Sequence, residues 1–305
     1  MIDLLKKFAV FFLLIGLAFP AHALDLGARA MGMGGAFTGL ADDVSAIVAN
    51  PAGLTAINRE SSLIASRVST DRQSSFIGGV ETTPIGNFGI AYVSSTDQAS
   101  IGSLDFSEFT SENVVSYSSQ TVYLSYANEL NKVIRAPSSL GVLSYGVNLK
   151  LSSRKFNTSQ GLAQDAGSNV DVDLATMFKP NDNLALGMSV QNMMSSEKAN
   201  QGGGLSAIDG KAGVLMGISG KLLGGGLVWS ADTEQLGCEW RPSDGLALRL
   251  GRDKESVTSG LGVNYRGFSV DYACVRKEGL VHYVSVAIAP FNSDAGTKQA
   301  NLPVE

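Results

Sequence analysis

Glycine is concentrated between residues 27 and 54, in a stretch that contains the run Gly32-Met33-Gly34-Gly35. Glycine-rich runs can surround phosphate groups with backbone N–H donors, so a nucleotide site is the first chemistry to consider. A phosphate loop needs Gly-Lys-Ser or Gly-Lys-Thr after the glycines, and neither follows here. A dinucleotide site needs these glycines between a strand and a long helix, and the stretch has no such surroundings. We therefore interpret the glycines as positions of tight turns and close backbone packing.

Catalytic and metal-binding chemistry has few candidates elsewhere in the chain. Of the two histidines, His22 lies in a predicted leader, and His282 falls on the apolar face of the last predicted strand. A Ser-His-Asp site would need that imidazole in the lumen. Asp171 and Asp173 resemble half of a calcium loop, but the glycine and glutamate that complete such a loop do not follow. The sequence therefore predicts neither an enzyme nor a cofactor.

The first 23 residues have the pattern of a cleaved secretory leader. Lys6 and Lys7 precede an apolar run from Phe8 to Phe19, and Ala21-His22-Ala23 forms a small-residue cleavage site. The formal net charge of −5, with no basic cluster, argues against nucleic-acid binding. No later run is long and apolar enough to be a membrane helix. If the exported chain enters a membrane, it must do so as a closed barrel.

Beyond residue 60 the chain alternates between apolar and polar residues, which indicates strands with two different faces. The run 183–191 is one of the clearest, and 246–251 is another. A soluble sandwich or barrel also alternates, but its polar face is usually rich in Lys, Glu and Thr. Here that face is rich in Gly, Ala, Ser and Asn. We therefore predict an all-β fold, a 14-stranded antiparallel transmembrane β-barrel in the bacterial outer membrane.

Isolated charges interrupt the face of small residues. Because an unpaired charge away from water is costly, we expect these side chains to form ion pairs inside the lumen. The predicted lumen charges are Lys150, Asp171, Asp173, Glu239, Arg241, Arg249, Arg266 and Asp271. The two cysteines, Cys238 and Cys274, fall on the apolar side of the alternation. We expect them to be free, lipid-facing thiols, with one disulfide as the alternative in an exported chain.

Residues 24–60 precede the strands and are predicted to form a hatch, or plug, inside the lumen. Fourteen strands tilted by about 40° give a backbone radius of roughly 14 Å, which side chains of the wall alone would not fill. Residues 42–49 indicate a short helix, capped by Asp42 or Asp43 and ended by Asn50-Pro51. The candidate hatch and gate residues are Gly32, Gly34, Gly35, Asp42, Asp43, Asn50, Pro51, Ala52 and Gly53.

The same stretch resembles the N-terminal motif of the FadL/PorV superfamily of outer-membrane β-barrels. The residues that carry the resemblance are Gly27, Arg29, Met31-Gly32, Gly34-Gly35-Ala36, Ala41-Asp42-Asp43 and Asn50-Pro51-Ala52-Gly53-Leu54. The remaining likeness is topological, and includes an aromatic residue close to the end of the barrel, here Phe291. The resemblance implies a hatch inside a 14-stranded barrel. In FadL-like transporters, hydrophobic substrates bind near the hatch and can leave sideways through the wall, whereas PorV-like members serve protein secretion and surface attachment.

Two functions and a structural role follow as expectations. The first function is a hatch-gated barrel that binds or passes small hydrophobic molecules, with lateral exit into outer-membrane lipid. The second is a PorV/PorQ-like accessory barrel that binds a protein of the secretion machinery through the connection near 193–210. The shortness of the chain, which suggests reduced external loops, favours the smaller PorQ-like members. The third possibility is a structural barrel sealed by its plug. The predicted divisions are a leader (1–23), the hatch (24–60), the barrel (61–291) and a tail (292–305).

Overall fold

The computed structural model describes residues 26–57, 61–68, 72–100, 114–134, 141–157, 163–193, 213–276 and 279–288. The predicted leader (1–23), most of the connection 193–210, Phe291 and the tail (292–305) lie outside these residues. Among the residues that are described, no helix is long and apolar enough to cross a membrane.

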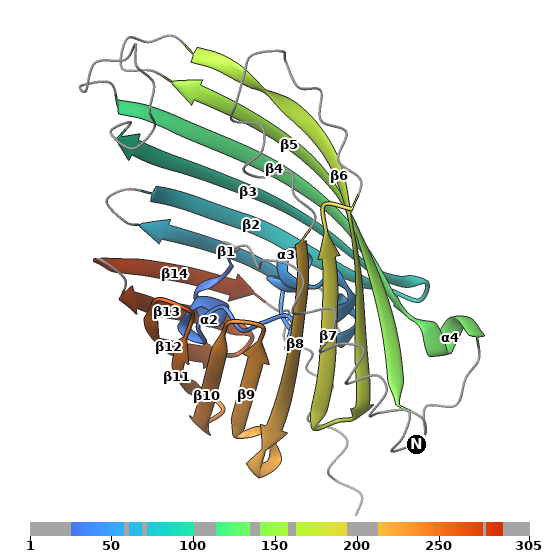
Figure 1. The fold of residues 1–305 in the computed structure, drawn as a ribbon. Helices are drawn as coiled ribbons and strands as arrows, with labels where there is room; N and C mark the ends of the chain where they lie inside the picture. Colours follow the sequence, from blue (N-terminus) through green and yellow to red (C-terminus); the bar gives the residue numbers. More distant parts are fainter. Residues whose placement is uncertain are drawn as a thin grey trace, which may run out of the picture.

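The described residues form one antiparallel sheet in which each strand pairs with its neighbours in sequence (Figure 1). β1 also pairs with β14, from Ser62 opposite Ile288 to Val68 opposite His282, and this pairing closes the sheet into a barrel. The all-β antiparallel fold expected from the alternation is confirmed. The strands are β1 (Ser61–Val68), β2 (Arg72–Thr83), β3 (Gly86–Ser100), β4 (Val114–Glu129), β5 (Val142–Asn157), β6 (Ala163–Asn181), β7 (Leu184–Gln191), β8 (Gly213–Leu222), β9 (Leu227–Asp232), β10 (Leu236–Ser243), β11 (Leu246–Arg252), β12 (Val257–Tyr265), β13 (Phe268–Arg276) and β14 (Leu280–Ile288).

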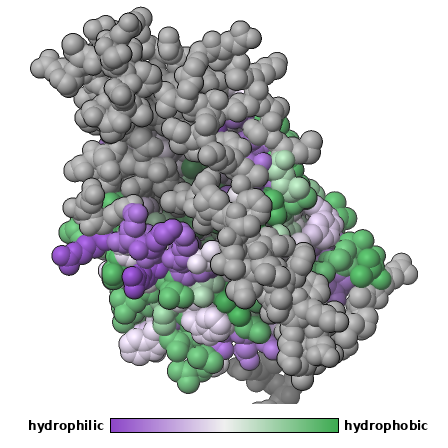
Figure 2. Space-filling view, in the orientation of Figure 1, coloured by the Kyte–Doolittle hydropathy of each residue, from purple (hydrophilic) through white to green (hydrophobic). Residues whose placement is uncertain are grey.

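The two faces of the wall differ as the alternation predicts. On β11, Leu248 and Leu250 point outward and are 40% and 66% exposed, whereas Ala247 and Arg249 between them are buried. On β7 the buried positions are alanine, glycine, serine and glutamine. Figure 2 shows hydrophobic residues gathered on the lower part of the visible face, below a group of hydrophilic residues. Apolar side chains outside and small or polar ones inside are the arrangement of a barrel surrounded by lipid.

The wall is uneven in height. β2–β6 contain 12 to 19 residues each, whereas β9–β14 contain six to nine. Residues 96–100 belong to β3 and residues 114–117 to β4, and the two strands remain paired as far as Ser100 opposite Val114. On β3 the residues 94–100 are polar except for Ala99, so the apolar pattern of that strand stops before its backbone pairing does.

The two ends of the barrel differ in their connections. At one end, short turns join β2 to β3, β6 to β7, β8 to β9, β10 to β11 and β12 to β13, and we name it the short-turn end. The turn between β8 and β9 contains the 3-10 helix η4 (Leu223–Gly225). At the same end the helix α4 (Leu130–Ile134) follows β4.

The N-terminal segment, Leu26–Ile57, lies inside the barrel. It contains the helices α2 (Ala28–Gly32) and α3 (Ala46–Ala49) and the 3-10 helix η1 (Pro51–Ala56). Its largest apolar side chains, among them Phe37 and Ile47, are completely buried and form one core with inward-facing residues of the wall. The segment therefore fills a lumen that the wall side chains leave open.

The helix predicted over 42–49 is shorter than expected. α3 begins at Ala46 with Ser45 as its N-cap residue, and no side chain caps it. Both carboxylates bind Arg29, and of the two predicted caps Asp43 also accepts from Ser45 N at 2.8 Å, in the turn that precedes the helix. The predicted end is correct: the helix stops at Ala49, and Asn50 is extended.

Candidate functional site

Arg29 on α2 is the centre of the polar contacts of the N-terminal segment. Its Nη1 atom lies 2.6 Å from Asp42 Oδ1 and 3.0 Å from Asp43 Oδ2, within the segment itself. Its Nε atom lies 3.0 Å from Glu239 Oε2, which belongs to β10 of the wall. Its guanidinium also lies 5.6 Å from the centre of the Phe37 ring, a cation–π distance. Arg29 thus joins the segment to the wall.

The network continues along the inner face of the wall. Glu239 is fully buried and accepts hydrogen bonds from Arg249 Nε at 2.6 Å and Arg241 Nη2 at 2.5 Å. Arg249 also lies 2.6 Å from Asp271 on β13. With Arg29, Asp42 and Asp43, this gives three guanidinium groups and four carboxylates, which we name the Arg29 network. Charges buried here are tolerated because each has a partner of opposite sign.

The two aspartates of the network differ in acidity. Burial disfavours the charge of Asp42, but the adjacent Arg29 guanidinium more than offsets this, so the pKa of Asp42 falls below its usual value. For Asp43 burial is the stronger influence, and the pKa is raised although Arg29 lies beside it. One arginine therefore holds the first carboxylate fully ionised and stabilises the second only in part.

Side chains of the wall bind the backbone of the N-terminal segment at many points. Asp232 on β9 accepts hydrogen bonds from Phe37 N and Thr38 N, both at 2.9 Å. Asn148 on β5 donates to Ile47 O at 2.8 Å, and Asn87 on β3 donates to Leu54 O at 2.5 Å. These wall residues were absent from the sequence prediction. The alternation in the sequence could have identified them, because each is a polar residue on the small-residue face of a strand.

Glycines give the segment room to lie against the wall. Gly34 has a left-handed φ of +70°, and a Cβ there would lie 2.7 Å from Arg252 N. Opposite the segment, a Cβ on Gly146, Gly187 or Gly237 would overlap the backbone of Ala52, Thr38 or Met33 respectively. The packing interpretation of Gly32, Gly34 and Gly35 agrees with this geometry, since Gly35 is also left-handed and Gly32 lies against Gly260.

Asn50-Pro51-Ala52-Gly53 forms the turn between α3 and η1. Asn50 Oδ1 accepts from Ala52 N at 3.1 Å and so caps η1, in which Pro51 occupies the first turn. Its Nδ2 atom donates to Thr38 O at 2.9 Å and to Thr176 O of β6 at 3.3 Å. Gly53 leaves no space for a side chain because Ala41 lies against it. One asparagine therefore joins two parts of the segment and the wall.

A second polar cluster lies on the opposite wall. Lys150 Nζ is 2.7 Å from Asp173 Oδ1, and it also contacts the side chain of Asn192. The expected pairing of Asp173 is therefore present. Asp171 lies opposite Lys150 in the β5–β6 register and is 4% exposed, but its Oδ1 atom has no hydrogen-bond partner among the described residues.

Arg266 is not a lumen charge, contrary to the sequence prediction. It lies in the exposed turn between β12 and β13 with a left-handed φ of +49°, and its guanidinium stacks 5.3 Å from the centre of the Tyr265 ring. The prediction extended the alternation of β12 to Arg266, one residue beyond the end of the strand at Tyr265, and so counted Arg266 as an inward-facing residue. Cys238 and Cys274 are free thiols, as predicted.

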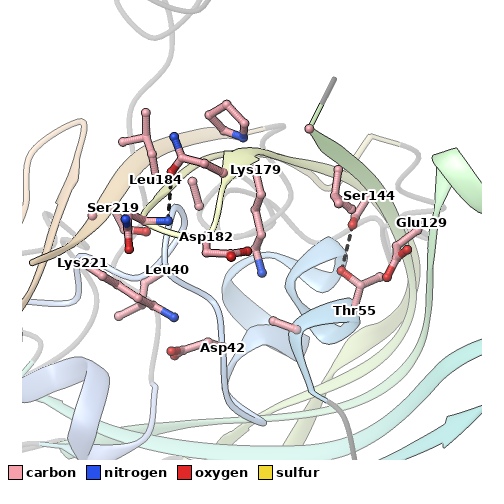
Figure 3. Close-up of a pocket in the computed structure, with 18 residues that line it drawn as sticks. Leu40, Asp42, Thr55, Glu129, Ser144, Lys179, Asp182, Leu184, Ser219 and Lys221 are labelled. Atoms are coloured by element: carbon pink, nitrogen blue, oxygen red, sulfur yellow. Dashed lines mark hydrogen bonds between the residues drawn. The ribbon is translucent and has the colours of Figure 1, made fainter. Parts of the chain in front are cut away.

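A pocket of about 760 Å³ opens between the N-terminal segment and β5–β8 at the short-turn end (Figure 3). Its lining includes Lys179, Lys221 and Asp42, and Figure 3 shows the two lysine side chains directed toward the aspartate. Thr55 and Ser144 meet across it, with 2.8 Å between their hydroxyl oxygens. Charges of both signs and hydroxyl groups make this a chamber for water rather than a pocket for an apolar molecule.

Comparisons with known proteins find relatives by structure alone. No protein-family model and no curated protein matches the chain. Three solved structures are similar. The toluene transporter TodX of Pseudomonas putida is 13% identical, with a TM-score of 0.58 over 88% of this chain and 97% of TodX. The monoaromatic hydrocarbon channel CymD is 11% identical, with a TM-score of 0.61 over 88% and 98%. A FadL homologue of Pseudomonas aeruginosa is 11% identical, with a TM-score of 0.53 over 88% and 99%.

The chain has the fold of FadL-type hydrophobic-compound transporters. The FadL-type fold agrees with the resemblance carried by the N-terminal motif and supports a place in the bacterial outer membrane. The secretion-accessory alternative gains no support from these structures. The FadL-type neighbours are transporters and channels, which is consistent with a non-enzymatic protein.

Proposed function

We propose that this protein is a fourteen-stranded outer-membrane barrel that passes small hydrophobic molecules, with the N-terminal segment as a hatch that gates the lumen. The observation that carries the proposal is the position of the segment. It occupies the interior of the closed wall and is attached there by one ion-pair network and by scattered hydrogen bonds. No disulfide joins it to the wall within the described residues, so its displacement requires only the loss of these non-covalent contacts.

We take the class of transported molecule from the FadL-type neighbours. The named neighbours transport toluene and monoaromatic hydrocarbons, and we extend this class to the present chain. The polar pocket at the short-turn end then forms the water-filled end of the path, beyond the hatch.

Thr55 and Ser144 offer a direct test of gating. Their γ oxygens are 2.8 Å apart, so the paired substitutions Thr55→Cys and Ser144→Cys place two sulfur atoms within reach of a disulfide. The test protein also carries Cys238→Ser and Cys274→Ser. We expect oxidation to fix the end of the hatch to β5 and to lower the uptake of labelled toluene by intact cells, and reduction to restore it. The single variant Thr55→Cys is the control, and equal uptake in the oxidised and reduced double variant would contradict the gate.

Lateral exit through the wall is the finer part of the proposal. The β6–β7 register begins at Leu174 opposite Val190, although β6 itself begins at Ala163. Beyond that pair, Asn192 N donates to Asp173 Oδ1 and Met193 N donates to Val172 O, both at 2.9 Å. We propose this side of β6 as the exit into lipid.

Val172 and Leu174 point outward on either side of that boundary. We expect Val172→Trp to obstruct the exit and lower toluene uptake, while Leu174→Trp, on the fully paired part of the same strand, leaves it unchanged. Equal effects of the two tryptophans would place the exit elsewhere.

A further inference from the structure

On the tall side of the barrel (β2–β6), three large apolar side chains of the described residues are exposed beyond the strands at the short-turn end. Ile85, in the turn between β2 and β3, is 68% exposed, and Val133 and Ile134 on α4 are 57% and 63% exposed. We name these residues the α4 patch. Figure 1 shows α4 projecting outward from the base of the tall side of the barrel. Exposure of such a group of apolar side chains to water is unfavourable, so contact with an apolar neighbour would stabilise the patch.

An aromatic cluster joins the patch to the lipid-facing wall. Phe88, Tyr126 and Tyr145 lie on the outer face of three adjacent strands, with ring centres 5.1 Å and 6.2 Å apart. The Tyr126 hydroxyl donates to Ile85 O at 2.7 Å. Tyrosines are enriched at the boundary between hydrocarbon and headgroups, because the ring is apolar and the hydroxyl is polar. The cluster therefore marks the membrane boundary on this side.

α4 is held firmly at this level. Asn131 Nδ2 donates to Gly141 O at 3.0 Å, and Asn131 Oδ1 accepts from Leu143 N at 2.8 Å, so both polar atoms of one side chain attach α4 to the start of β5. Lys132 lies 3.2 Å from Glu129, and its side chain is 67% exposed. A lysine at this position can extend its ammonium group toward lipid phosphates.

The depth of the patch follows from the strand geometry. Glu129, where β4 ends, is three positions beyond Tyr126. At about 3.3 Å per residue and a tilt of about 40°, they advance roughly 8 Å along the membrane normal. The headgroup layer of one leaflet is about 5–8 Å thick, as the difference between total and hydrocarbon thickness shows. The start of α4 thus falls in that layer and not far beyond it.

We propose that the α4 patch is a membrane anchor, inserted among the lipid headgroups and the adjoining acyl carbons of the leaflet at the short-turn end. The inference rests on the membrane insertion that the proposed function includes. Lipid is the partner that fits, because the patch is continuous through the aromatic cluster with the outward apolar residues Ile90, Leu124 and Leu149. The anchor fixes the height of the tall side of the barrel in the bilayer.

Fluorescence quenching in vesicles tests the anchor. A bimane label is placed at Val133→Cys, in a protein with Cys238→Ser and Cys274→Ser, reconstituted into phosphatidylcholine and phosphatidylglycerol vesicles that contain nitroxide lipids. Leu250→Cys, 66% exposed on the outer wall, is the control for lipid contact. Asp244→Cys, in the exposed turn between β10 and β11, is the control for water contact at the same end. A second label at Ile134→Cys guards against a local effect of one substitution.

We expect headgroup and shallow-chain nitroxides to quench the labels at 133, 134 and 250 at least twofold more than the label at 244. Labels at 133 and 134 that behave like the one at 244, while 250 is quenched, would overturn the anchor and leave the barrel in the membrane. Absence of quenching at 250 would show that insertion itself is wrong. Labels at 133 and 134 shielded from both lipid and iodide would indicate a protein contact and would also overturn the anchor.

Discussion

Arg29 has three carboxylates within 3.0 Å, two from its own segment and one from the wall. Its side chain is 13% exposed, so little solvent screens these charges. Sequence reasoning included Arg29 in the motif of the resemblance but not among the gate residues, because nothing local shows that Glu239, 210 residues away, is its partner. The interaction that attaches the segment to β10 is therefore a property of the tertiary structure.

Replacing Arg29 by methionine tests this attachment. The substitution leaves Asp42 and Asp43 without their cation, and breaking a buried ion pair costs about 3–5 kcal/mol. We expect a loss of that size in the free energy of unfolding from vesicles, measured by urea titration, together with higher toluene uptake. Arg266→Met, in an exposed turn, is the matched control and should change stability by less than about 0.5 kcal/mol. A loss with Arg266→Met as large as that with Arg29→Met would show that the network is not the cause.

The opposite acidities of Asp42 and Asp43 predict a pH dependence. The lowered pKa of Asp42 adds stability above the unfolded value of 3.8, and this stability is lost as the pH falls through its folded pKa. The raised pKa of Asp43 acts in the other direction: its penalty grows as the pH rises from 3.8 through the folded pKa and is complete above it. Asp43→Asn keeps an acceptor for Ser45 N but carries no charge.

We therefore expect Asp43→Asn to gain stability relative to the parent at pH 7 and to lose that advantage near pH 4. Urea titrations at both pH values measure the difference. Asp42→Asn is the matched comparison and should be less stable than the parent at pH 7. A gain for both variants at pH 7 would contradict the assignment of the two acidities.

At the scale of elements, the inward glycines of the wall determine where the segment can lie. Gly146 on β5, Gly187 on β7 and Gly237 on β10 each face a different part of its backbone. β5 and β7 are two strands apart and β10 lies three strands beyond β7, so the wall is matched to the segment at points from Met33 to Ala52. Such matching allows little change of position without the loss of contacts around it.

Gly187→Ala tests the fit. A Cβ at this position would overlap Thr38 O and approach Asn50 Nδ2, and overpacking of this kind costs about 1–3 kcal/mol. Gly226→Ala is the matched control, because its nearest neighbour would be an ordinary 3.4 Å away. Urea titration of the two variants measures the difference. No difference between them would mean that the N-terminal segment shifts freely beside β7.

The sequence predicted the strands of the wall better than the contacts of the N-terminal segment inside it. Period-two alternation identifies outward and inward positions such as Leu248 and Arg249 because each strand repeats the same simple rule. The helix at Ala46–Ala49 was placed, but its partners were not, since pairs such as Asn148 with Ile47 depend on how fourteen strands close around the segment. Arg266 was misplaced because a turn residue can continue the alternation without belonging to the strand.

At the scale of the whole molecule, the apolar belt is shorter than the tall strands. Tyr92, Val122 and Leu151 form one outward row in register across β3, β4 and β5. The next outward row consists of Ser94, Gln120 and Ser153, and it continues to Ser168 on β6. Polar residues here place the upper part of the tall side in water, above the belt.

Cysteine labelling tests this boundary. Gln120 and Leu124 lie on the same outer face of β4, Gln120 in the polar row and Leu124 in the apolar row beyond Val122, with Ile90 and Leu149. In a protein without its native cysteines, we expect Gln120→Cys in intact cells to react with a membrane-impermeant maleimide at least tenfold faster than Leu124→Cys. Similar rates would mean that the belt extends above Gln120 or ends below Leu124.

The seam between β1 and β14 has a consequence for assembly. It joins the first strand of the wall to the last, so the wall cannot close until the whole chain has been made. The segment that fills the interior precedes β1 in the chain, and the inward glycines let its backbone lie directly against the wall. Its entry and the closing of the seam are therefore one cooperative event in folding, and a chain whose segment docks slowly must remain an open sheet with two unpaired edges for that time.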